Sequence, residues 1–471
     1  MTSHAASCNC ANSLRRKSPF ECNACGAMLW RNLLGKGLCK PASLIFPLEG
    51  IFPRKFTFSG RRHREMKHLF DFSDFNVYDS EITNLSVGAP GPDLLAQCCE
   101  IFKEATEHRL NFEKENNSFL FQYGPTLGMN DFREELSTFL TREYGSEVQK
   151  KSIVLTSGAT NGLHHILSCL LDMNAVIFVD EVTYMIALEA FQQFTGMKII
   201  PVPFRDDGVD IGELRRLVQL HKFTPHPDKL FWGLYYAIPT FHNPTGVTLS
   251  REKCQNLVAM AREFDFLISC DDVYNLLYYT GESPKRLFAY DRQSDEGYRG
   301  HIISNGSFSK ILSPGIRIGW MECPKRIVEV FRNSGIIKSG GAINNYTSGI
   351  VTSLLQLGLA KKQLTTYCAA YKERMEAVCK ILRDDLPPEV KFIPPTGGYF
   401  AWLTFPPTFD AVAFNQFCQE HHSVIAIAGP KFSPIQAHRN CLRICVVFHS
   451  VDTMRNATRR LCAAYRAFVS R

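Results

Sequence analysis

The sequence predicts an α/β fold, in which a mostly parallel sheet is flanked by helices and a smaller domain follows. Between residues 152 and 321, short β-branched runs alternate with helical patterns, which is typical of parallel sheets with crossover helices. After about residue 363, a long helical pattern leads to a second set of strands and helices. The 471 residues also exceed what one hydrophobic core usually serves.

The chain is predicted to divide into a leader and two structural domains. Residues 1–75 form a basic leader, 76–119 begin the small domain, 120–360 form the large domain and 361–471 complete the small domain. Residues 1–70 carry 12 Lys and Arg against three acids, a net charge of +9, so the total of +7 leaves −2 for the remainder. An Arg-rich, acid-poor start is typical of a transit peptide. A disordered tail, or an extension preceding a start at Met66, are the alternatives.

Composition excludes several classes of protein. The apolar fraction of 45% and the charged fraction of 21% are ordinary for a soluble enzyme. No window approaches 18 uninterrupted apolar residues, so we expect no membrane span. The 17 cysteines are scattered, which favours reduced thiols in an intracellular protein. Four of them, Cys8, Cys10, Cys22 and Cys25, could offer thiolates to zinc, but no strand or helix pattern flanks them, and we expect no metal.

The first elements after the leader are a short strand and two helices. Residues 82–92 predict a strand with a Gly-Pro turn, and helices are expected over 93–113 and from about Asn130. Gly88 lies in the turn, where a residue without Cβ would let a backbone N–H approach a carboxylate. An ordinary turn glycine is the alternative. Tyr123 precedes Gly124 just before the second helix.

A candidate anion site follows at residues 152–171. A β-run ends in small residues, Gly158, Ala159 and Thr160, and a helical pattern begins there. Free backbone N–H groups and the positive end of the helix dipole would both face an anion. The P-loop and dinucleotide patterns are absent, and a plain strand-to-helix turn is the alternative.

Three further strand ends carry candidate site residues. Tyr184 follows the strand at 175–180, where its ring could stack on a flat ligand or belong to the core. Asn243 lies in His-Asn-Pro-Thr-Gly after a buried strand, and the following proline favours an extended backbone. Asp271 and Tyr274 end the next strand, with Asp272 as the competing carboxylate.

The stretch from Ser304 to Met321, SNGSFSKILSPGIRIGWM, places Lys310 on the connection between two strands. Ser307 and Ser309 flank the lysine, and Arg317 follows a Pro-Gly turn. A lysine in such a place costs free energy unless its amine is used, although a solvated loop lysine is the alternative. Near the C-terminus, strands are expected over 390–405, 424–429 and 441–448. The last contains Arg443, a charge that needs either a salt-bridge partner or a substrate.

Together these motifs resemble the pyridoxal-phosphate-dependent class I and II aminotransferases of fold type I. The matching patterns are S-x-S-K-x-x-x-P-G-x-R-x-G around Lys310, N-P-T-G at Asn243 and D-x-x-Y at Asp271, and the resemblance covers about residues 80–471. The nearest subgroup looks to be the 2-aminoadipate, kynurenine and aromatic aminotransferases. The resemblance implies a large domain with a seven-stranded type of sheet and a smaller α+β domain. Val273 departs from the usual proline, and Ala159-Thr160 replaces a polar pair, which leaves substrate preference open.

The resemblance also implies a role for each candidate residue. Lys310 would hold pyridoxal phosphate covalently and transfer protons, and Asp271 would pair with the ring nitrogen. The remaining cofactor contacts would be Asn243 and Tyr274 at the ring oxygen, Tyr184 on the ring face, and Gly158, Ala159, Thr160, Ser307, Ser309 and Arg317 at the phosphate, with Tyr123 reaching the phosphate from a second subunit. The substrate would meet Gly88, Asn243 and the clamp Arg443.

The predicted function is therefore amino-group transfer between an L-amino acid (aromatic, 2-aminoadipate-like or branched) and a 2-oxo acid such as 2-oxoglutarate. By resemblance we expect a homodimer with shared active sites, in the cytoplasm or mitochondrial matrix, with neither nucleic acid nor membrane as a partner. A lyase or synthase on the same scaffold is one alternative, because fold does not determine the reaction. A transcription regulator is another, but the leader lacks a helix-turn-helix pattern.

Overall fold

The computed structural model describes residues 82–339 and 343–471. The predicted leader at 1–75, with its four closely spaced cysteines, lies outside these residues, and the predicted domain boundaries stay a prediction. Within this part of the chain, no helix combines the length and the apolar character that crossing a membrane requires.

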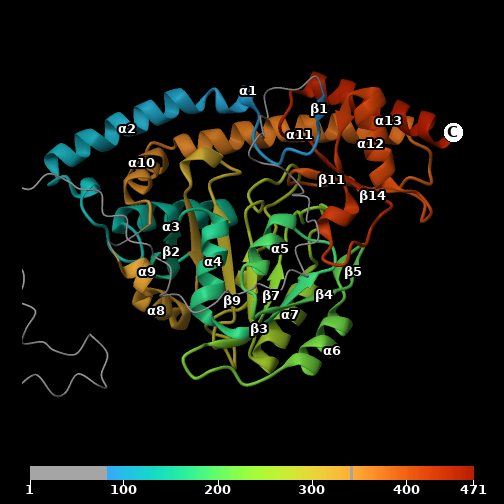
Figure 1. The fold of residues 1–471 in the computed structure, drawn as a ribbon. Coiled ribbons are helices and arrows are strands. Elements are labelled where there is room, and N and C mark those ends of the chain that lie inside the picture. Colours follow the sequence, from blue (N-terminus) through green and yellow to red (C-terminus); the bar gives the residue numbers. More distant parts are fainter. Residues whose placement is uncertain (1–81, 340–342) are drawn as a thin grey trace, which may run out of the picture. The chain divides into compact units, whose positions relative to one another are not determined.

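A seven-stranded sheet forms the centre of the described chain (Figure 1). Its strands lie in the order β2 (Ile153–Thr156), β10 (Gly319–Glu322), β9 (Ile302–Ser307), β8 (Leu267–Asp271), β7 (Phe231–Ala237), β3 (Leu171–Asp180) and β4 (Lys198–Val202). Only β10 runs antiparallel to its neighbours, and the other adjacent pairs are parallel. The predicted α/β class with a mostly parallel sheet is therefore confirmed.

Helices cover both faces of this sheet, because its strands are apolar on both sides. All seven residues of β7 are buried, as expected for a parallel strand covered by helices on both faces. One face packs against α6 (Ile211–His221) and α7 (Arg251–Phe264). The other face packs against α4 (Ala159–Leu170) and α5 (Met185–Gln192), and this core continues to α3 (Asn130–Tyr144), α8 (Lys325–Asn333) and α10 (Asn345–Gln356).

The C-terminal part forms a smaller antiparallel sheet with its own helices (Figure 1). Its strands are β11 (Phe400–Thr404), β14 (Cys441–Cys445) and β13 (Ile427–Ala428), and its helices are α11 (Leu359–Asp385), α12 (Ala411–His422) and α13 (Val451–Val469). The first described strand, β1 (Thr83–Asn84), pairs in parallel with β12 (Val424–Ile425). This pairing brings the N-terminal segment beside the C-terminal part, although more than 300 residues separate them in sequence.

Several elements are shorter than predicted. The strand expected over 390–405 is reduced to β11, because Pro394 and Pro395 lack N–H groups and Gly398 has a φ of 74°. The helix expected over 93–113 is divided into α1 (Pro92–Leu95) and α2 (Cys98–Glu115). The short helix α9 (Gly335–Lys338), which follows α8 (Lys325–Asn333), and the hairpin of β5 (Phe204–Arg205) with β6 (Gly208–Val209) were not predicted.

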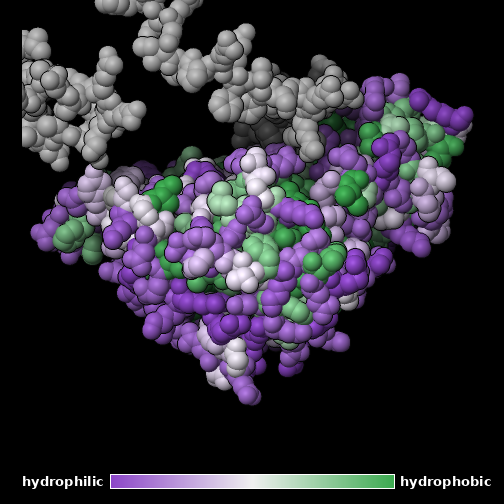
Figure 2. Space-filling view, turned by 60° about the horizontal axis from the view of Figure 1, so that its bottom comes forward, coloured by the Kyte–Doolittle hydropathy of each residue, from purple (hydrophilic) through white to green (hydrophobic). Residues whose placement is uncertain are grey.

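The surface matches this division into core and exterior. The face shown in Figure 2 is mostly hydrophilic, and hydrophobic residues reach it in separate patches.

Because β3, β7, β8 and β9 are parallel, their carboxyl ends lie along one edge of the sheet. Ligands of open α/β sheets bind beyond such an edge.

Candidate active site

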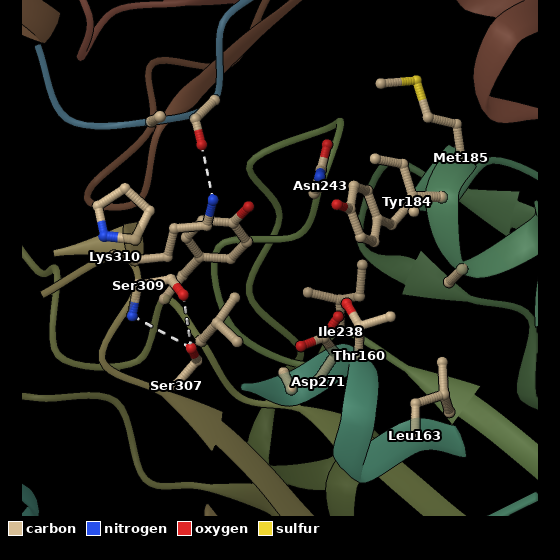
Figure 3. Close-up of a pocket in the computed structure, with 18 of the residues that line it drawn as sticks. Thr160, Leu163, Tyr184, Met185, Ile238, Asn243, Asp271, Ser307, Ser309 and Lys310 are labelled. Atoms are coloured by element: carbon tan, nitrogen blue, oxygen red, sulfur yellow. Dashed lines mark hydrogen bonds between the residues drawn. The ribbon is translucent and has the colours of Figure 1, made fainter. Parts of the chain in front are cut away.

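A cavity of about 380 Å³ lies where these strands end. The candidate residues that line it are Gly88, Ala159, Thr160, Tyr184, Asn243, Asp271, Tyr274, Ser307, Ser309, Lys310, Arg317 and Arg443. Figure 3 shows Lys310, Tyr184, Asn243 and Asp271 pointing from different elements toward one space. The fold therefore brings together residues that are up to 355 positions apart in sequence.

The Lys310 amine lies inside the cavity, three residues after the end of β9. Its Nζ donates a hydrogen bond of 2.6 Å to the carbonyl oxygen of Gly88 (Figure 3). The pKa of Lys310 falls from 10.5 to about 8, chiefly because the amine is buried; Arg443 and Arg317 contribute to the decrease, and Cys445 and Asp271 oppose it. A substantial fraction of the amine is therefore neutral near pH 8, the form that attacks a carbonyl.

Of the two adjacent carboxyl groups, Asp271 faces the cavity. Its Oδ2 accepts a hydrogen bond of 2.6 Å from the Tyr236 hydroxyl, whereas its buried Oδ1 has no hydrogen-bond partner in the described chain. Burial raises the pKa of Asp271 to about 6. Asp272 accepts a hydrogen bond from Ser304 instead and is absent from the lining of this cavity. The geometry therefore favours Asp271 over Asp272.

One end of the cavity is built for an anion. Arg317 Nη1 donates to Ser309 Oγ at 3.1 Å, and Ser307 and Ser309 are hydrogen-bonded to each other at 2.9 Å. The helix α4 begins at Ala159, after Gly158, without a side-chain cap, so its first N–H groups stay available. Gly158 has a φ of 88°, and a Cβ there would come within 2.5 Å of Arg317 Nη2. Only glycine lets the turn and the guanidinium approach so closely.

Arg443 supplies a third cation, from the smaller antiparallel sheet. Its side chain in β14 is 2% exposed, and Nη1 and Nη2 donate to Asn243 Oδ1 at 2.9 Å and to the Ser86 carbonyl oxygen at 2.7 Å. The guanidinium carbon lies 4.2 Å from the centroid of the Phe400 ring. Burial lowers the pKa of Arg443, and the groups that oppose this decrease are the thiol of Cys445 and the hydroxyls of Tyr274 and Tyr184 rather than a carboxylate. A carboxylate ligand would supply the missing counter-charge.

Two tyrosines line the cavity in different ways. Tyr184 precedes α5, and its hydroxyl points into the cavity in Figure 3. Tyr274 packs edge-on against Tyr399 and Phe400, with ring centroids 5.3 and 5.7 Å apart. Burial raises the pKa of both Tyr184 and Tyr274, so both hydroxyls are protonated hydrogen-bond donors at neutral pH.

Two predicted residues differ from the expected geometry. Gly88 turns its carbonyl oxygen toward Lys310, and a Cβ on it would meet only Phe400, at an ordinary 3.5 Å. Close backbone approach is therefore not what requires glycine here. Tyr123 is 80% exposed and lines a separate hollow with Gly124 and Asn130, outside the cavity of its own chain.

Comparison with known proteins identifies the family. The model of the family "Aminotransferase class I and II" matches residues 80–461. The chain belongs to this family. Aromatic-amino-acid aminotransferase 1 of Thermococcus litoralis is 28% identical over 404 residues, which are 85% of this chain and 91% of the relative.

Solved aminotransferase structures share the fold. The kynurenine aminotransferase of Pyrococcus horikoshii, solved in complex with PMP, has a TM-score of 0.72 and 28% identity, covering 83% of this chain and 93% of that one. The α-aminoadipate aminotransferase of Thermus thermophilus, complexed with N-(5'-phosphopyridoxyl)-L-leucine, has a TM-score of 0.68 and 25% identity over 83% and 93% of the two chains. The protein is thus a pyridoxal-phosphate-dependent aminotransferase.

The residues present fit this cofactor. The unpartnered Asp271 Oδ1 offers an acceptor for a protonated ring nitrogen, and the neutral fraction of the Lys310 amine suits an aldehyde. The turn at Gly158, with Arg317 beside it, suits a phosphate. In the described chain, no group of three or more His, Cys, Asp and Glu side chains is placed to hold a metal ion.

Sequence reasoning missed three residues of this aminotransferase site. Tyr236 and Phe400 line the cavity, and so does Asn305, which donates to the Ala159 carbonyl oxygen at 2.8 Å. Tyr236 stands in the apolar run LFWGLYYAIP, where it resembles any core aromatic. Alternation along the strand could have indicated Tyr236. Side chains two residues apart lie on one face of a strand, and Tyr236 shares with Ile238 the face that leads to the site.

Proposed function

We propose that this aminotransferase acts on L-amino acids with apolar side chains, aromatic or branched, and on a 2-oxo acid. One observation carries the proposal: the cavity wall beyond Lys310 is apolar. It contains Val87, Met185, Ile186 and Phe400. In the described part of the chain, the only cations lining the cavity are Lys310, Arg317 and Arg443. With the first two on the cofactor, one cation would remain, enough for a single carboxylate.

Bound pyridoxal phosphate supplies an aldehyde that takes up the amino group and a ring that withdraws electrons from the substrate Cα. Lys310 would hold the cofactor until the substrate amine displaces it. Its freed amine would then remove the proton from the substrate Cα and return it at the cofactor C4′ atom. Such proton transfer contributes roughly 10²–10⁴-fold to a rate. The lowered pKa of Lys310, about 8, supports this role because the amine can both accept and release a proton near neutrality.

The other residues would hold charge in place. Asp271 Oδ1 would keep a proton on the ring nitrogen, and Tyr274 would donate to the ring oxygen. Asn243 Oδ1 already accepts from Arg443, so its amide Nδ2 would be free to donate to the same ring oxygen. Arg443 would bind the substrate α-carboxylate with two parallel N–H groups, a fork that lysine lacks.

A substrate panel tests the preference. We expect kcat/KM for phenylalanine and leucine to exceed that for 2-aminoadipate and aspartate by at least about tenfold, because an unpaired carboxylate against an apolar wall loses hydration. Equal or faster turnover of the acidic amino acids would contradict the apolar preference and favour the 2-aminoadipate-like alternative.

Replacing the lysine tests the chemistry itself. Lys310→Ala should remove the visible absorption of the lysine-bound cofactor and lower transamination by at least about 10⁴-fold. The matched control is Lys362→Ala, on the exposed surface of α11, which should leave both unchanged. In the wild type, amino acid alone should yield one equivalent of 2-oxo acid per site. Continuous release of ammonia would indicate a lyase instead.

We also propose a homodimer in which Tyr123 of each subunit reaches the cofactor phosphate of the other. Its support is the exposure of Phe119, Phe121 and Tyr123, at 62%, 65% and 80%. Tyr346 on α10 lies beside Phe121, with ring centroids 6.0 Å apart. Light scattering should give twice the chain mass of 53.3 kDa, and Tyr123→Phe should weaken phosphate binding. A monomer with unchanged cofactor affinity would contradict the shared site.

For the compartment we propose the cytoplasm or the mitochondrial matrix. The twelve cysteines of the described chain are free thiols, as in reducing compartments, and the leader is basic. N-terminal sequencing of the native protein distinguishes the two: a matrix protein should have lost its leader, and a cytoplasmic one should retain it.

A further inference from the structure

Two adjacent tyrosines on β7 are buried on opposite faces of the sheet. Tyr235 and Tyr236 are each 1% exposed. Tyr236 packs in the core that surrounds the active site, whereas Tyr235 packs with Trp232 in the core beneath α6 and α7. This is the alternation that any strand imposes on consecutive side chains.

Both hydroxyls make the same hydrogen bond. Tyr236 donates to Asp271 Oδ2, and Tyr235 donates to Asp180 Oδ1, each at 2.6 Å. Asp271 ends β8 and Asp180 ends β3, the two strands that flank β7. Each tyrosine also has the same register relative to the strand that carries its aspartate.

In the parallel ladders, Tyr236 lies opposite Ser269 and Tyr235 lies opposite Phe178. Each aspartate is two residues beyond that position, and therefore on the same face as its tyrosine. The two pairs are thus equivalent in local geometry and differ in what the second carboxylate oxygen meets.

Asp180 Oδ2 lies 3.3 Å from His242 Nε2, so this carboxylate has a neighbour on each oxygen. Asp271 lines the cavity, and its Oδ1 is buried without a hydrogen-bond partner in the described chain. A carboxylate held at one oxygen has its other oxygen directed by that bond. The ring of Tyr236 is itself held by Phe191, with centroids 5.4 Å apart at 76°.

We propose that Tyr236 is a positioning residue, whose hydroxyl holds Asp271 by Oδ2 and thereby directs Oδ1 at the ring nitrogen of the cofactor. The inference rests on the role proposed above for Asp271. Two charged groups act on the same carboxyl: Asp272 beside it raises the pKa of Asp271, and Lys310 across the cavity lowers it. The Tyr236 hydrogen bond also lowers this pKa, which favours the ionised form that a protonated ring nitrogen requires.

The experiment compares Tyr236→Phe with Tyr235→Phe. Each variant loses one hydroxyl and one equivalent hydrogen bond to an aspartate. The apoproteins are titrated with pyridoxal phosphate and with the analogue in which C–H replaces the ring nitrogen. We expect the wild type to prefer pyridoxal phosphate. Tyr236→Phe should weaken the binding of pyridoxal phosphate about tenfold and change the binding of the analogue less than twofold. A hydrogen bond to a charged group contributes about as much free energy as a tenfold change in affinity.

Tyr235→Phe should leave the preference between the two cofactors unchanged and affect only the midpoint of thermal unfolding. Equal weakening of both cofactors by Tyr236→Phe, or no weakening of either, would overturn the inference. A wild type without any preference would instead overturn the role of Asp271. If Tyr236→Phe does not fold, Tyr236→Met also removes the hydroxyl while a flexible apolar side chain fills the space. It should reduce the preference for pyridoxal phosphate over the analogue about as much as Tyr236→Phe, and an unchanged preference would overturn the inference.

Discussion

Two groups of buried charges lie close to the central sheet, and they are built differently. The first is the active site, with Lys310, Asp271 and Arg443. The second, the Arg286 cluster, consists of Arg286, Glu322, Asp272 and Tyr144. In the cluster Arg286 is hydrogen-bonded to Glu322, and its guanidinium carbon lies 4.1 Å from the centroid of the Tyr144 ring.

Burial acts on both groups and raises the pKa of Glu322 and Asp272 as it raises that of Asp271, but the neighbours outweigh burial only for the cation of the cluster. Burial by itself would lower the pKa of Arg286, yet Glu322, Tyr144 and Asp272 raise it above its usual value. In the site, burial dominates, so that the pKa falls for Lys310 and Arg443 and rises for Asp271. The cluster holds its charges for the fold, whereas each charge of the site is incompletely matched until a ligand arrives.

The largest expected effect breaks the cluster. Arg286→Met should lower the free energy of unfolding by roughly 3–5 kcal/mol, because it leaves Glu322 as an unpaired buried charge. Urea unfolding measures this. The double variant Arg286→Met/Glu322→Leu should recover most of the loss, since it removes both charges. A loss below about 1 kcal/mol in the single variant would contradict the structural role of the pair.

A smaller effect is expected when the substrate clamp is altered. Arg443→Lys should raise KM for the amino acid roughly 10–100-fold, because an ammonium cannot form the paired hydrogen bonds of a guanidinium. Cofactor absorption should stay unchanged. Arg439→Lys is the matched control, an exposed arginine near the start of β14 that pairs with Asp410 at 2.8 Å, and it should leave KM unchanged. An equal increase of KM in both variants would contradict the role of Arg443 as the substrate clamp.

The smallest effect has the opposite sign to the first. Lys310→Met should stabilise the apoprotein by about 1 kcal/mol at pH 7, because relief of the cost of the buried ammonium, roughly 3 kcal/mol, is partly offset by the lost hydrogen bond to the Gly88 carbonyl oxygen. The folded pKa of Lys310 is about 8 and the unfolded value is 10.5. The unfolded chain therefore binds more protons between these values, and wild-type stability rises with pH there.

The advantage of Lys310→Met should accordingly be full below pH 8 and disappear as the pH approaches 10.5. Thermal unfolding of both apoproteins across this range measures the difference. Lys372→Met, on the exposed side of α11, serves as control and should change stability by less than about 0.5 kcal/mol. A destabilised Lys310→Met would mean that the active-site lysine contributes to the fold, as Arg286 does.

The pattern of residues along the chain was enough to predict the α/β class, most strand positions and the residues gathered at the site. Lys310, Asp271 and Asn243 each follow an apolar run that became a strand, and parallel strands end at one edge. Arg443 could be selected because a charge in an apolar strand needs a partner. The shortened strand before β11 was the main error in the elements, because prolines outweighed an otherwise β-like run.

Which groups face one another could be seen only once the strands were paired in the fold. That Asp271 enters the cavity while Asp272 bonds Ser304, that Gly88 offers its carbonyl oxygen, and that Tyr236 reaches Asp271 all depend on register between strands. The physical reason is that periodicity in a sequence assigns a side chain to a face, but the neighbour it meets there comes from another strand. Tyr235 and Tyr236 are identical side chains at adjacent positions. They have different partners only because one bonds an aspartate of β3 and the other an aspartate of β8.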